Sequence, residues 1–354
     1  MKILYVGPDY RGSNGTCWRD AFVALGCDVR TVDGERLLSW PVTPAERVAA
    51  KLGARPPWRR VSDLNEAIGA AAKEFRPQTT FFVQARFVRS ETIAAIAEFG
   101  PTVVYCNDDM FNPANRTFTF EGAVRQADCL ITTKSFNVPE FLRAGARRVL
   151  YQPNAFDPAI HFPARPSPAD VQAMAGDVAF VGTFRPDRAD YLAEVVRRLP
   201  ESTVNVWGGG WEKMRRAVYW YRRRRWAPLR RRIRGGGLWC EDMGKAIQAN
   251  KIALGLLYHV NRDLHTSRSF EIPACGGFML AQRTAEHQEY FEEDREAVYF
   301  GSLDELIDKA RYYLRHDDAR LAIARAGHVR CLQSGYRYVD RARSLLSALG
   351  RGPR

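Results

Sequence analysis

The sequence predicts an α/β protein made of two doubly wound domains, each built on a parallel β-sheet. Short apolar runs typical of buried strands alternate with longer segments of helical periodicity along almost the whole chain. The alternation stops once, in a proline-rich stretch near the middle, and then restarts. Strands that alternate with helices form parallel sheets, because a helix carries the chain back before the next strand begins. We therefore expect one such sheet on each side of that stretch.

Length and composition agree with two domains. The chain has 354 residues, too many for one ordinary core, and 46% of them are hydrophobic. Seven cysteines without a CxxC pair favour reduced thiols over disulfides or a zinc site. The apolar run at the start is too short for a signal peptide, and none approaches the roughly 18 residues of a membrane span. We expect a cytoplasmic protein, either soluble or peripheral on the inner face of the plasma membrane.

The predicted first domain covers residues 1–152 and is Rossmann-like. A Gly-rich loop leads from its first strand into a helix near residues 17–25, and further helical patterns cover residues 61–75 and 90–99. Its predicted strands are KILYVG, DVRTVDG, TFFVQ, TVVYCND, CLITT and RVLYQP.

Residues 153–170 contain five prolines and little periodicity, which predicts an interdomain linker. The second Rossmann-like domain is expected over residues 171–335, followed by a C-terminal helix within residues 336–354 that Gly350 can end. The predicted strands of the second domain are VAFVG, VNVWG, IALGLL, FMLA and AVYFG. Its predicted helices are 187–199, 268–274, 302–314 with a Ser302–Glu305 capping box, and 318–333.

The segment 262–299 carries the residues that say most about function. Arg268 and Glu271 lie three positions apart on the short helix 268–274, so both project from nearly one face. A cation and a carboxylate placed in this way could hold a diphosphate and a sugar hydroxyl together.

Further polar residues flank that helix and the strand VAFVG. Amides and hydroxyls at a helix start favour phosphate, while plain capping is the alternative. Arginine forks after a strand suit phosphate oxygens, although surface arginines are common. The candidate donor-binding residues are His265, Thr266, Ser267, Gly182, Thr183, Arg185, Arg188 and the glycines of the turn after the helix, Gly276 and Gly277.

Two candidates lie in the first domain. The loop Gly12, Ser13, Asn14 and Gly15 could offer amides to phosphate or sugar oxygens, or be a plain strand-to-helix turn. Its glycine spacing does not match G-x-G-x-x-G, which disfavours a nicotinamide-dependent enzyme. Asp109 ends the strand TVVYC and is the candidate general base, with helix capping as the alternative.

The motif SRSFEIPACGGFML, residues 267–280, resembles the donor-site segment of two-Rossmann-domain (GT-B) glycosyltransferases of the group 1 type. It is most similar to the bacterial CgeB-like (spore maturation protein B-like) family, and the resemblance covers residues 178–345. It implies a donor domain at the C-terminal end, an acceptor domain at the N-terminal end, a cleft between them, and a final helix that crosses back. Asp263 and Glu271 have the spacing of the acidic pair of retaining members, with Asp where the broader pattern has Glu.

The implied activity is metal-independent hexosyl transfer from a nucleotide sugar to a glycan, lipid-linked or protein acceptor of the bacterial cell envelope, in polysaccharide biosynthesis. The nucleotide sugar is a substrate, so no cofactor is expected. Six histidines without an HxH or HExxH pattern disfavour a metal site. The acidic pair implies retention, whereas inversion needs a base such as Asp109. The expected catalytic residues are Arg268, Glu271, Asp109 and Asp263.

Residues 213–234, which we call the basic segment, contain eleven Lys and Arg and no acidic residue. The whole chain has a net charge of +13, so the other residues together carry only +2. We expect a helix that Pro228 ends, with Met214, Ala217, Val218 and Tyr221 on one face. Cations beside interfacial aromatics fit an anionic membrane surface. The residues of this predicted membrane patch are Trp220, Arg222, Arg223, Arg224, Arg225 and Trp226.

Other functions stay open at this point. A sugar-nucleotide epimerase of the same two-domain shape would use the same donor contacts. A non-catalytic nucleic-acid-binding protein would use the basic segment through phosphate contacts and base stacking. Nucleic acid is the less favoured partner, because no nucleic-acid-binding motif accompanies the basic segment. A merely solvated basic insertion is a further alternative.

Overall fold

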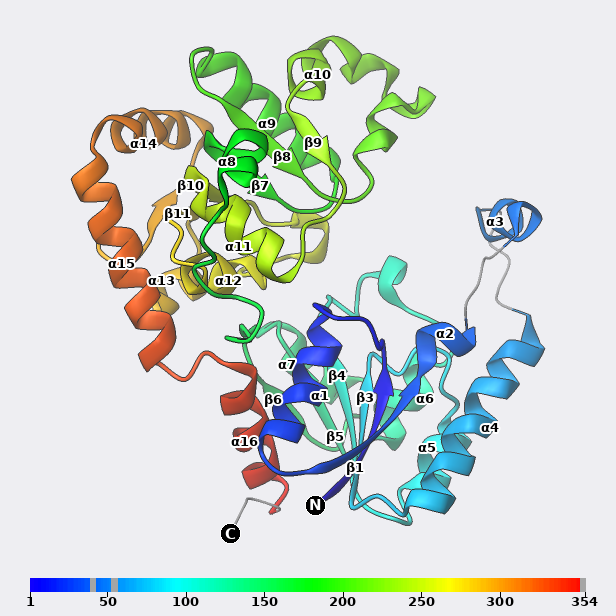
Figure 1. The fold of residues 1–354 in the computed structure, drawn as a ribbon. Coiled ribbons are helices and arrows are strands. Elements are labelled where there is room, and N and C mark those ends of the chain that lie inside the picture. The colour runs from blue at the N-terminus through cyan, green and yellow to red at the C-terminus, as the bar shows by residue number, and fades with distance from the viewer. Residues whose placement is uncertain (39–42, 52–56, 351–354) are drawn as a thin grey trace. The chain divides into compact units, whose positions relative to one another are not determined.

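The computed structural model describes residues 1–38, 43–51 and 57–350. The chain forms two compact units (Figure 1): Met1–Pro153 with Tyr338–Arg354, and Asn154–Arg337. Each unit contains one six-stranded sheet in which every pair of neighbouring strands is parallel. The predicted α/β fold class with two doubly wound parallel sheets is therefore confirmed.

The sheet of the first unit has the strand order β2-β1-β3-β4-β5-β6. The chain runs from β1 outward to β2 and then passes back over β1 to reach β3, so the direction of winding reverses between β1 and β3. Ligands of open parallel sheets bind beyond the carboxyl ends of the strands at such a switch point. The strands are β1 (Lys2–Gly7), β2 (Asp28–Asp33), β3 (Thr79–Val83), β4 (Thr102–Cys106), β5 (Cys129–Thr132) and β6 (Val149–Tyr151).

Helices cover both faces of this sheet. On one face α1 and α16 lie side by side (Figure 1). Trp18 of α1 contacts Phe81 of β3, Tyr105 of β4 and, on α16, Tyr338. The other face packs against a second apolar cluster that includes residues of α4 to α7. The helices are α1 (Asn14–Ala24), α2 (Gly34–Leu38), α3 (Pro44–Lys51), α4 (Trp58–Phe75), α5 (Ser90–Ile96), η1 (Pro113–Asn115), α6 (Phe120–Gln126), α7 (Asn137–Arg143) and α16 (Tyr338–Ala348).

The sheet of the second unit has the order β12-β11-β10-β7-β8-β9, so its winding reverses between β7 and β10. Every apolar run predicted as a strand forms one, in both units. The short β9 was not predicted, because its sequence IRG lies in the basic segment and lacks an apolar run. The strands are β7 (Gly176–Val181), β8 (Val204–Trp207), β9 (Ile233–Gly235), β10 (Asn250–Gly255), β11 (Met279–Gln282) and β12 (Val298–Phe300).

Apolar side chains fill both faces of the second sheet. One cluster joins the strands to α9, α10 and α14, and another joins them to α11, α12 and α15. None of the described helices is both long enough and apolar enough to span a bilayer. The helices are α8 (Pro168–Met174), α9 (Pro186–Arg198), η2 (Trp211–Arg215), η3 (Ala217–Arg222), α10 (Arg223–Arg230), α11 (Cys240–Gln248), η4 (His259–Asn261), α12 (Arg268–Ala274), α13 (Ala285–Tyr290), α14 (Leu303–Arg315) and α15 (Asp317–Gln333).

The proline-rich stretch differs from a simple linker. Phe156 is fully buried and forms a bridge with Arg337 within the second unit. The helix α8 begins at Pro168, and a reciprocal capping box between Ser167 and Asp170 starts it. Burial of one aromatic side chain and one helix start therefore give this stretch ordered structure of its own.

Helix ends follow their predicted caps with one difference. The Ser302 hydroxyl accepts the Glu305 N–H at the start of α14, as predicted. The Glu305 carboxylate, however, accepts the N–H of Gly301 rather than that of Ser302. After α16, Gly350 takes a positive φ of 67° and donates its N–H to Ser347, as a C-terminal glycine does.

The prediction of one amphipathic helix in the basic segment is wrong. The segment folds as two 3₁₀ helices, η2 and η3, followed by α10, which contains Pro228 instead of ending there. Met214 is buried, whereas Val218 and Tyr221 are exposed, so the predicted common face does not form. Trp226 is fully buried, because α10 packs on α9. It therefore cannot belong to an exposed membrane patch.

Candidate functional site

Three arginines gather at the switch point of the second sheet. Arg268, the first residue of α12, donates from Nε to the carbonyl oxygen of Val181 at 2.9 Å, where β7 ends. Arg188 donates from Nε to the carbonyl oxygen of Leu257 at 3.2 Å, just beyond β10. Arg185 stacks its guanidinium on the ring of Tyr258, with 4.2 Å to the ring centre. Positive charge is thus concentrated where the topology favours a ligand.

The charges of these arginines are incompletely balanced. Burial lowers the pKa of Arg268 to about 10, and the nearby charge of Arg188 acts in the same direction. Burial also lowers the pKa of Arg188, although Asp263 and Asp187 oppose the shift. Both guanidinium groups stay protonated at neutral pH. A bound anion would stabilise them, since opposite charge favours the protonated form.

Arg185 supplies the most direct sign of a ligand. Its Nε atom is buried and has no hydrogen-bond partner among the described residues. Buried N–H groups are nearly always paired with protein, water or a bound ion, so this donor is available to an anion. Beside it lies a hollow of about 580 Å³. The hollow is lined by Phe184, Arg185, Pro186, Asp187, Asp190, Lys213, Tyr219, Arg222, Tyr258, His259 and Val260.

Glu271 lies behind Arg268 rather than in the open. Its carboxylate forms an ion pair with Nη1 of Arg268, and its Oε1 lies 3.6 Å from Nε2 of His161. The side chain of Glu271 is 4% exposed, whereas that of Arg268 is 28% exposed. Glu271 therefore orients Arg268, and direct contact of Glu271 with a sugar hydroxyl stays a prediction.

His161 is a neutral neighbour of this ion pair. Its Nδ1 accepts the backbone N–H of Asp157 at 3.0 Å, which leaves the ring proton on Nε2, facing Glu271. Burial, followed by the positive charge of Arg268, lowers the pKa of His161 to about 3. The ring therefore does not add a second positive charge to the pair at neutral pH.

The residues before α12 are mostly occupied within the protein. His265 is fully buried, with Nδ1 at 2.5 Å from Glu286 and Nε2 accepting the N–H of Asn154. The N–H of Thr266 donates to the hydroxyl of Ser269. Both ring nitrogens of His265 and the backbone N–H of Thr266 are thus occupied within the chain. The predicted contact of Thr266 with phosphate stays a prediction for its hydroxyl. Ser267 forms no side-chain cap, so its hydroxyl remains a candidate.

Ser269 and His287 form a second buried pair beneath α12. The hydroxyl of Ser269 lies 2.7 Å from Nε2 of His287, whose Nδ1 lies 2.6 Å from the carbonyl oxygen of Gln282. That carbonyl can only accept, so Nδ1 carries the proton and Nε2 accepts from the serine. Burial lowers the pKa of His287 to about 4, which keeps the ring neutral. The pair fixes α12 to the end of β11.

Asp263 closes the turn after β10. One carboxylate oxygen accepts the N–H of Tyr258 at 3.2 Å, and Arg262 between them takes a positive φ of 49°. The carboxylate also acts electrostatically on Arg188. Asp263 and Arg188 therefore lie close together, and the catalytic role of the first and the donor-binding role of the second stay predictions.

The predicted glycines have different surroundings. Gly276 and Gly277 line a hollow with Gly176 and Asn250, the first residues of β7 and β10, and so lie at the amino edge of the sheet. Gly276 has φ 72°, and Gly277 donates its N–H to Ile272 at 3.0 Å, so the two glycines end α12. The three arginines lie at the opposite, carboxyl edge of the sheet, so the structure does not bring these glycines together with them. The donor-binding role of Gly276 and Gly277 stays a prediction.

Gly182 and Thr183 do lie at the carboxyl edge. The carbonyl oxygen of Gly182 accepts the indole N–H of Trp211 at 3.1 Å, and a Cβ on Gly182 would come within 2.7 Å of the Phe180 ring. Thr183 is exposed, and its carbonyl oxygen accepts from Nη1 of Arg188 at 3.4 Å. Both residues therefore shape the loop that carries the arginines.

The switch point of the first sheet holds a hollow of about 410 Å³ that no sequence motif indicated. The loop beyond β3 is strained there, because Gln84, Ala85 and Phe87 have φ values of 60°, 46° and 60°. Left-handed conformations of residues other than glycine cost about 1 kcal/mol or more each and cluster at functional sites. The hollow is lined by Val6, Gly7, Pro8, Gly34, Glu35, Leu38, Leu64 and residues 83–88.

The predicted site residues of the first unit have structural partners. Asp109 is 2% exposed, and its Oδ1 accepts from the N–H of Phe111 and from Nδ2 of Asn137, both at 3.0 Å. Asp109 caps none of the described helices, because the next one, η1, begins at Pro113 and has Asn112 as its cap. Asp109 does not line the hollow, and its role as general base stays a prediction.

The loop before α1, Gly12 to Gly15, fits the alternative of a plain strand-to-helix turn. Ser13 caps the helix by accepting the N–H of Thr16, and Gly12 supplies a positive φ of 90°. A Cβ on Gly15 would lie 2.4 Å from the hydroxyl of Tyr5, so close packing requires the glycine. Asn14 is the first helical residue.

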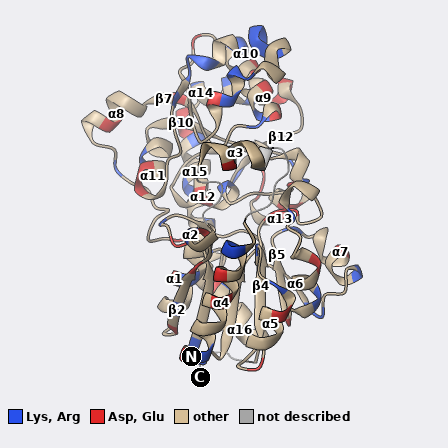
Figure 2. Ribbon diagram, turned by 90° about the vertical axis from the view of Figure 1, so that its right-hand side faces the viewer, with Lys and Arg blue, Asp and Glu red and all other residues tan. Residues whose placement is uncertain are grey.

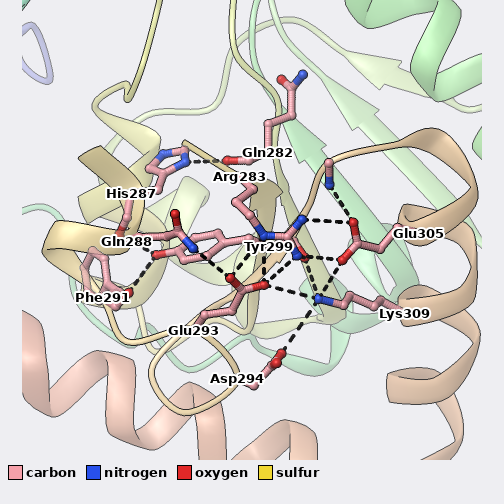
Figure 3. Close-up of polar contacts among 11 residues, drawn as sticks. Gln282, Arg283, His287, Gln288, Phe291, Glu293, Asp294, Tyr299, Glu305 and Lys309 are labelled. Carbon is pink, nitrogen blue, oxygen red and sulfur yellow. Dashed lines mark hydrogen bonds and ion pairs between the residues drawn. The ribbon is translucent and has the colours of Figure 1, made fainter. Parts of the chain in front are cut away.

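A separate cluster of ion pairs in the second unit contains charges that neutralise one another (Figure 3). Arg283 donates to the carboxylates of Glu293 and Glu305, and Lys309 pairs with the same two groups. Hydrogen bonds from Arg283 hold the pKa of both carboxyls below their usual range. These charges are paired with each other, so the cluster is structural, unlike the arginines at the switch point.

Comparisons with known proteins agree with the fold. Residues 187–347 match a family model described as glycosyl transferase-like. Among solved structures, HepE of Anabaena in complex with UDP-glucose is similar, with 16% identity, 99% of both chains covered and a TM-score of 0.68. Sucrose-phosphate synthase of Thermosynechococcus elongatus is similar at 13% identity over 98% of both chains, with a TM-score of 0.67. No curated protein matches the chain in sequence.

A third similar structure is a putative UDP-N-acetylglucosamine 2-epimerase of Listeria monocytogenes, at 12% identity, with 100% of this chain and 98% of that chain covered and a TM-score of 0.57. Taken together, the two parallel six-stranded sheets with flanking helices are the fold of GT-B glycosyltransferase structures. The resemblance to the CgeB-like family in particular stays a prediction.

Proposed function

We propose that this protein transfers a sugar from a nucleoside diphosphate sugar to an acceptor hydroxyl. The observation that carries the proposal is the arginine cluster at the switch point of the second sheet, with the buried Nε of Arg185 lacking a partner among the described residues. A diphosphate supplies the oxygen acceptors and the negative charge that these groups need. The adjacent hollow, with the exposed ring of His259 and the ring of Tyr258, would take the nucleoside or the sugar.

The arginines would also accelerate the reaction. The departing diphosphate gains negative charge as the bond to the sugar breaks, and donors fixed in advance stabilise that charge. Arg268 is held by Val181 and Glu271, so it needs little reorganisation. Because arginines neutralise the diphosphate, the proposed mechanism is metal-independent. Retention of configuration is proposed from the spacing of Asp263 and Glu271.

We assign the acceptor to the hollow of the first unit. Its walls are mainly apolar, including Leu38 and Leu64, so an acceptor with an apolar part fits them. Glu35 lines the same hollow, and burial, together with the charge of Asp33, raises the pKa of its carboxyl. Glu35 is thus placed to bind an acceptor hydroxyl. The acceptor that we propose is a lipid-linked glycan, another envelope glycan or a protein, and the transfer takes place at the cytoplasmic side.

Binding measurements with Arg185→Met test the donor site. Arg185 has no ion pair among the described residues, so its replacement leaves no buried carboxylate without a partner. Wild type should bind one of UDP-, GDP- or dTDP-sugars in isothermal titration, and the variant should bind it about 10- to 100-fold more weakly. Arg325→Met, an exposed position on α15, is the matched control. Equal affinity of Arg185→Met and wild type would contradict the proposal.

Epimerisation of a nucleotide sugar is the second candidate, since a putative epimerase shares the fold. The two reactions differ in their need for an acceptor. A transferase releases the nucleoside diphosphate in proportion to acceptor, whereas an epimerase changes the sugar of the bound donor with no acceptor present. Chromatography of the products with and without 4-nitrophenyl glucoside distinguishes the two.

A further inference from the structure

The structure divides the basic segment into an inner and an outer side. Trp226 and Leu229 of α10 are fully buried, and the ring of Tyr219 contacts those of Phe184 and Trp226. These side chains join the apolar core beside α9. The inner side therefore anchors the segment to the second unit.

The outer side presents apolar and aromatic side chains to solvent. Val218 is 65% exposed, Trp220 71% and Tyr221 60%. The backbone of η3 is non-helical at Tyr219, with φ −104° and ψ 19°, and Val218 and Tyr221 lie on either side of this kink. The ring of Trp220 lies 6.4 Å from that of Tyr221. These three large exposed side chains, which fall within four positions, form the tip of the basic segment.

Positive charge that is not balanced locally surrounds this tip. Arg222 and Arg225 form ion pairs with Asp190 of α9, so their charge is partly neutralised. Arg223 and Arg224 are exposed and form no ion pair in the part of the chain that the structure describes.

Like Arg223 and Arg224, Arg215 and Arg216 are exposed and form no ion pair with any described residue. Figure 2 shows Lys and Arg gathered around α10. Glu212 is the only acidic residue between positions 208 and 240.

We infer that this tip, defined by Val218, Trp220 and Tyr221 with Arg215, Arg216, Arg223 and Arg224, docks on an anionic lipid surface. Aromatic rings and valine gain free energy at the boundary between headgroups and acyl chains, where arginines meet lipid phosphates. A nucleic acid would use the same charges but would leave Val218 in water. The docking surface lies on η3 and α10 and goes beyond the proposed sugar transfer, because it does not depend on that reaction.

Sedimentation with lipid vesicles tests the inference on the full-length protein. Wild type should pellet with vesicles of phosphatidylcholine mixed with phosphatidylglycerol and stay in solution with phosphatidylcholine alone. The variant R223S/R224S should lower the partition coefficient by about 25-fold, since each arginine near an anionic surface contributes about fivefold. W220S/Y221S removes the apolar contribution without changing charge and should lower it by about tenfold or more.

Two controls keep the result interpretable. R315S/R325S removes two exposed positive charges from α14 and α15 of the same unit and should leave the partition coefficient within about twofold of wild type. A thermal melt of each variant reports folding independently of any enzyme activity. Equal pelleting on the two vesicle types, or W220S/Y221S variants that partition like wild type, would overturn the inference. Binding to a single-stranded oligonucleotide that Trp220 and Tyr221 support, without binding to vesicles, would also overturn it.

Discussion

The two units share one sheet architecture and differ in what stands at its carboxyl edge. In the second unit the switch point between β7 and β10 carries Arg185, Arg188 and Arg268. In the first unit the switch point between β1 and β3 carries a hollow with mainly apolar walls, where Glu35 and Arg86 are the charged residues. The backbone supplies a ligand position in both, and the side chains at that position decide which ligand it takes.

This difference has a physical consequence for the proposed reaction. A diphosphate needs fixed cations, and an acceptor with an apolar part needs a surface that it can bury. The two requirements conflict within one pocket, because burying apolar surface beside the arginines would desolvate their charges. Separate sheets allow each edge to specialise.

Loss of Arg268 should have the largest effect. In the proposed reaction, replacing it by Met removes a donor to the departing diphosphate, so turnover should fall by about 10²- to 10³-fold. The companion variant R268M/E271Q also removes the buried carboxylate charge that would otherwise lose its partner. Steady-state kinetics of both variants, with thermal melts, check this. Activity within a few-fold of wild type in a folded variant would place the diphosphate elsewhere.

Acid should weaken the second unit before the first, since all six histidines belong to the second unit. The pKa of His161 is lowered to about 3 and that of His287 to about 4, chiefly by burial, from an ordinary value of about 6.5. Below pH ~6.5 the unfolded chain binds protons that the folded unit does not. Stability is therefore highest above that pH and falls as pH drops, by up to about 1.4 kcal/mol per pH unit for each ring.

Chemical denaturation at a series of pH values measures this slope. The variant His161→Asn should show a shallower loss of stability between about pH 6 and pH 4, because one titrating ring is gone. An unchanged slope would show that the His161 ring is already accessible to protons in the folded state. Hydrogen exchange can assign the loss to the second unit.

The substitution Leu38→Trp should affect acceptor binding at the first sheet without affecting donor binding at the second. A larger ring at the hollow of the first unit should raise the KM for 4-nitrophenyl glucoside by about tenfold, while the affinity for the donor stays the same. Isothermal titration of the donor is the matched measurement. A parallel loss of donor affinity would show that the hollow is not an acceptor site of its own.

Glu305→Gln should have the smallest effect. Its carboxylate pairs with Arg283 and Lys309, and all three side chains are between 23% and 31% exposed, so water screens the cluster. Unfolding free energy should fall by about 1 kcal/mol at neutral pH, with no change in donor affinity. Because the pKa of Glu305 is lowered by Arg283, the contribution should disappear as pH falls below the unfolded value of about 4.3. A change in donor affinity would contradict the structural role.

The sequence by itself determined the strands, the fold class and part of the candidate site. Runs such as KILYVG and VAFVG are buried on both sides in a parallel sheet, so their apolar character alone identifies them. Arg185 and Arg188 could be predicted because they follow the strand VAFVG, and a parallel sheet places its ligand groups beyond the carboxyl ends of its strands. Asp263 was predicted from its spacing to Glu271 in the resembling family. Gly276 and Gly277 precede a strand, and the same reasoning places them at the opposite edge.

Only the tertiary structure decided which polar groups are open to a ligand. It buried Glu271 behind Arg268, occupied Asp109 and His265 with internal partners, turned Trp226 inward, and shaped the hollow of the first unit. The physical reason is that strand and helix patterns depend on near neighbours in the chain. Burial, pairing and cavity shape depend instead on segments far apart in sequence, which meet only when the sheets form.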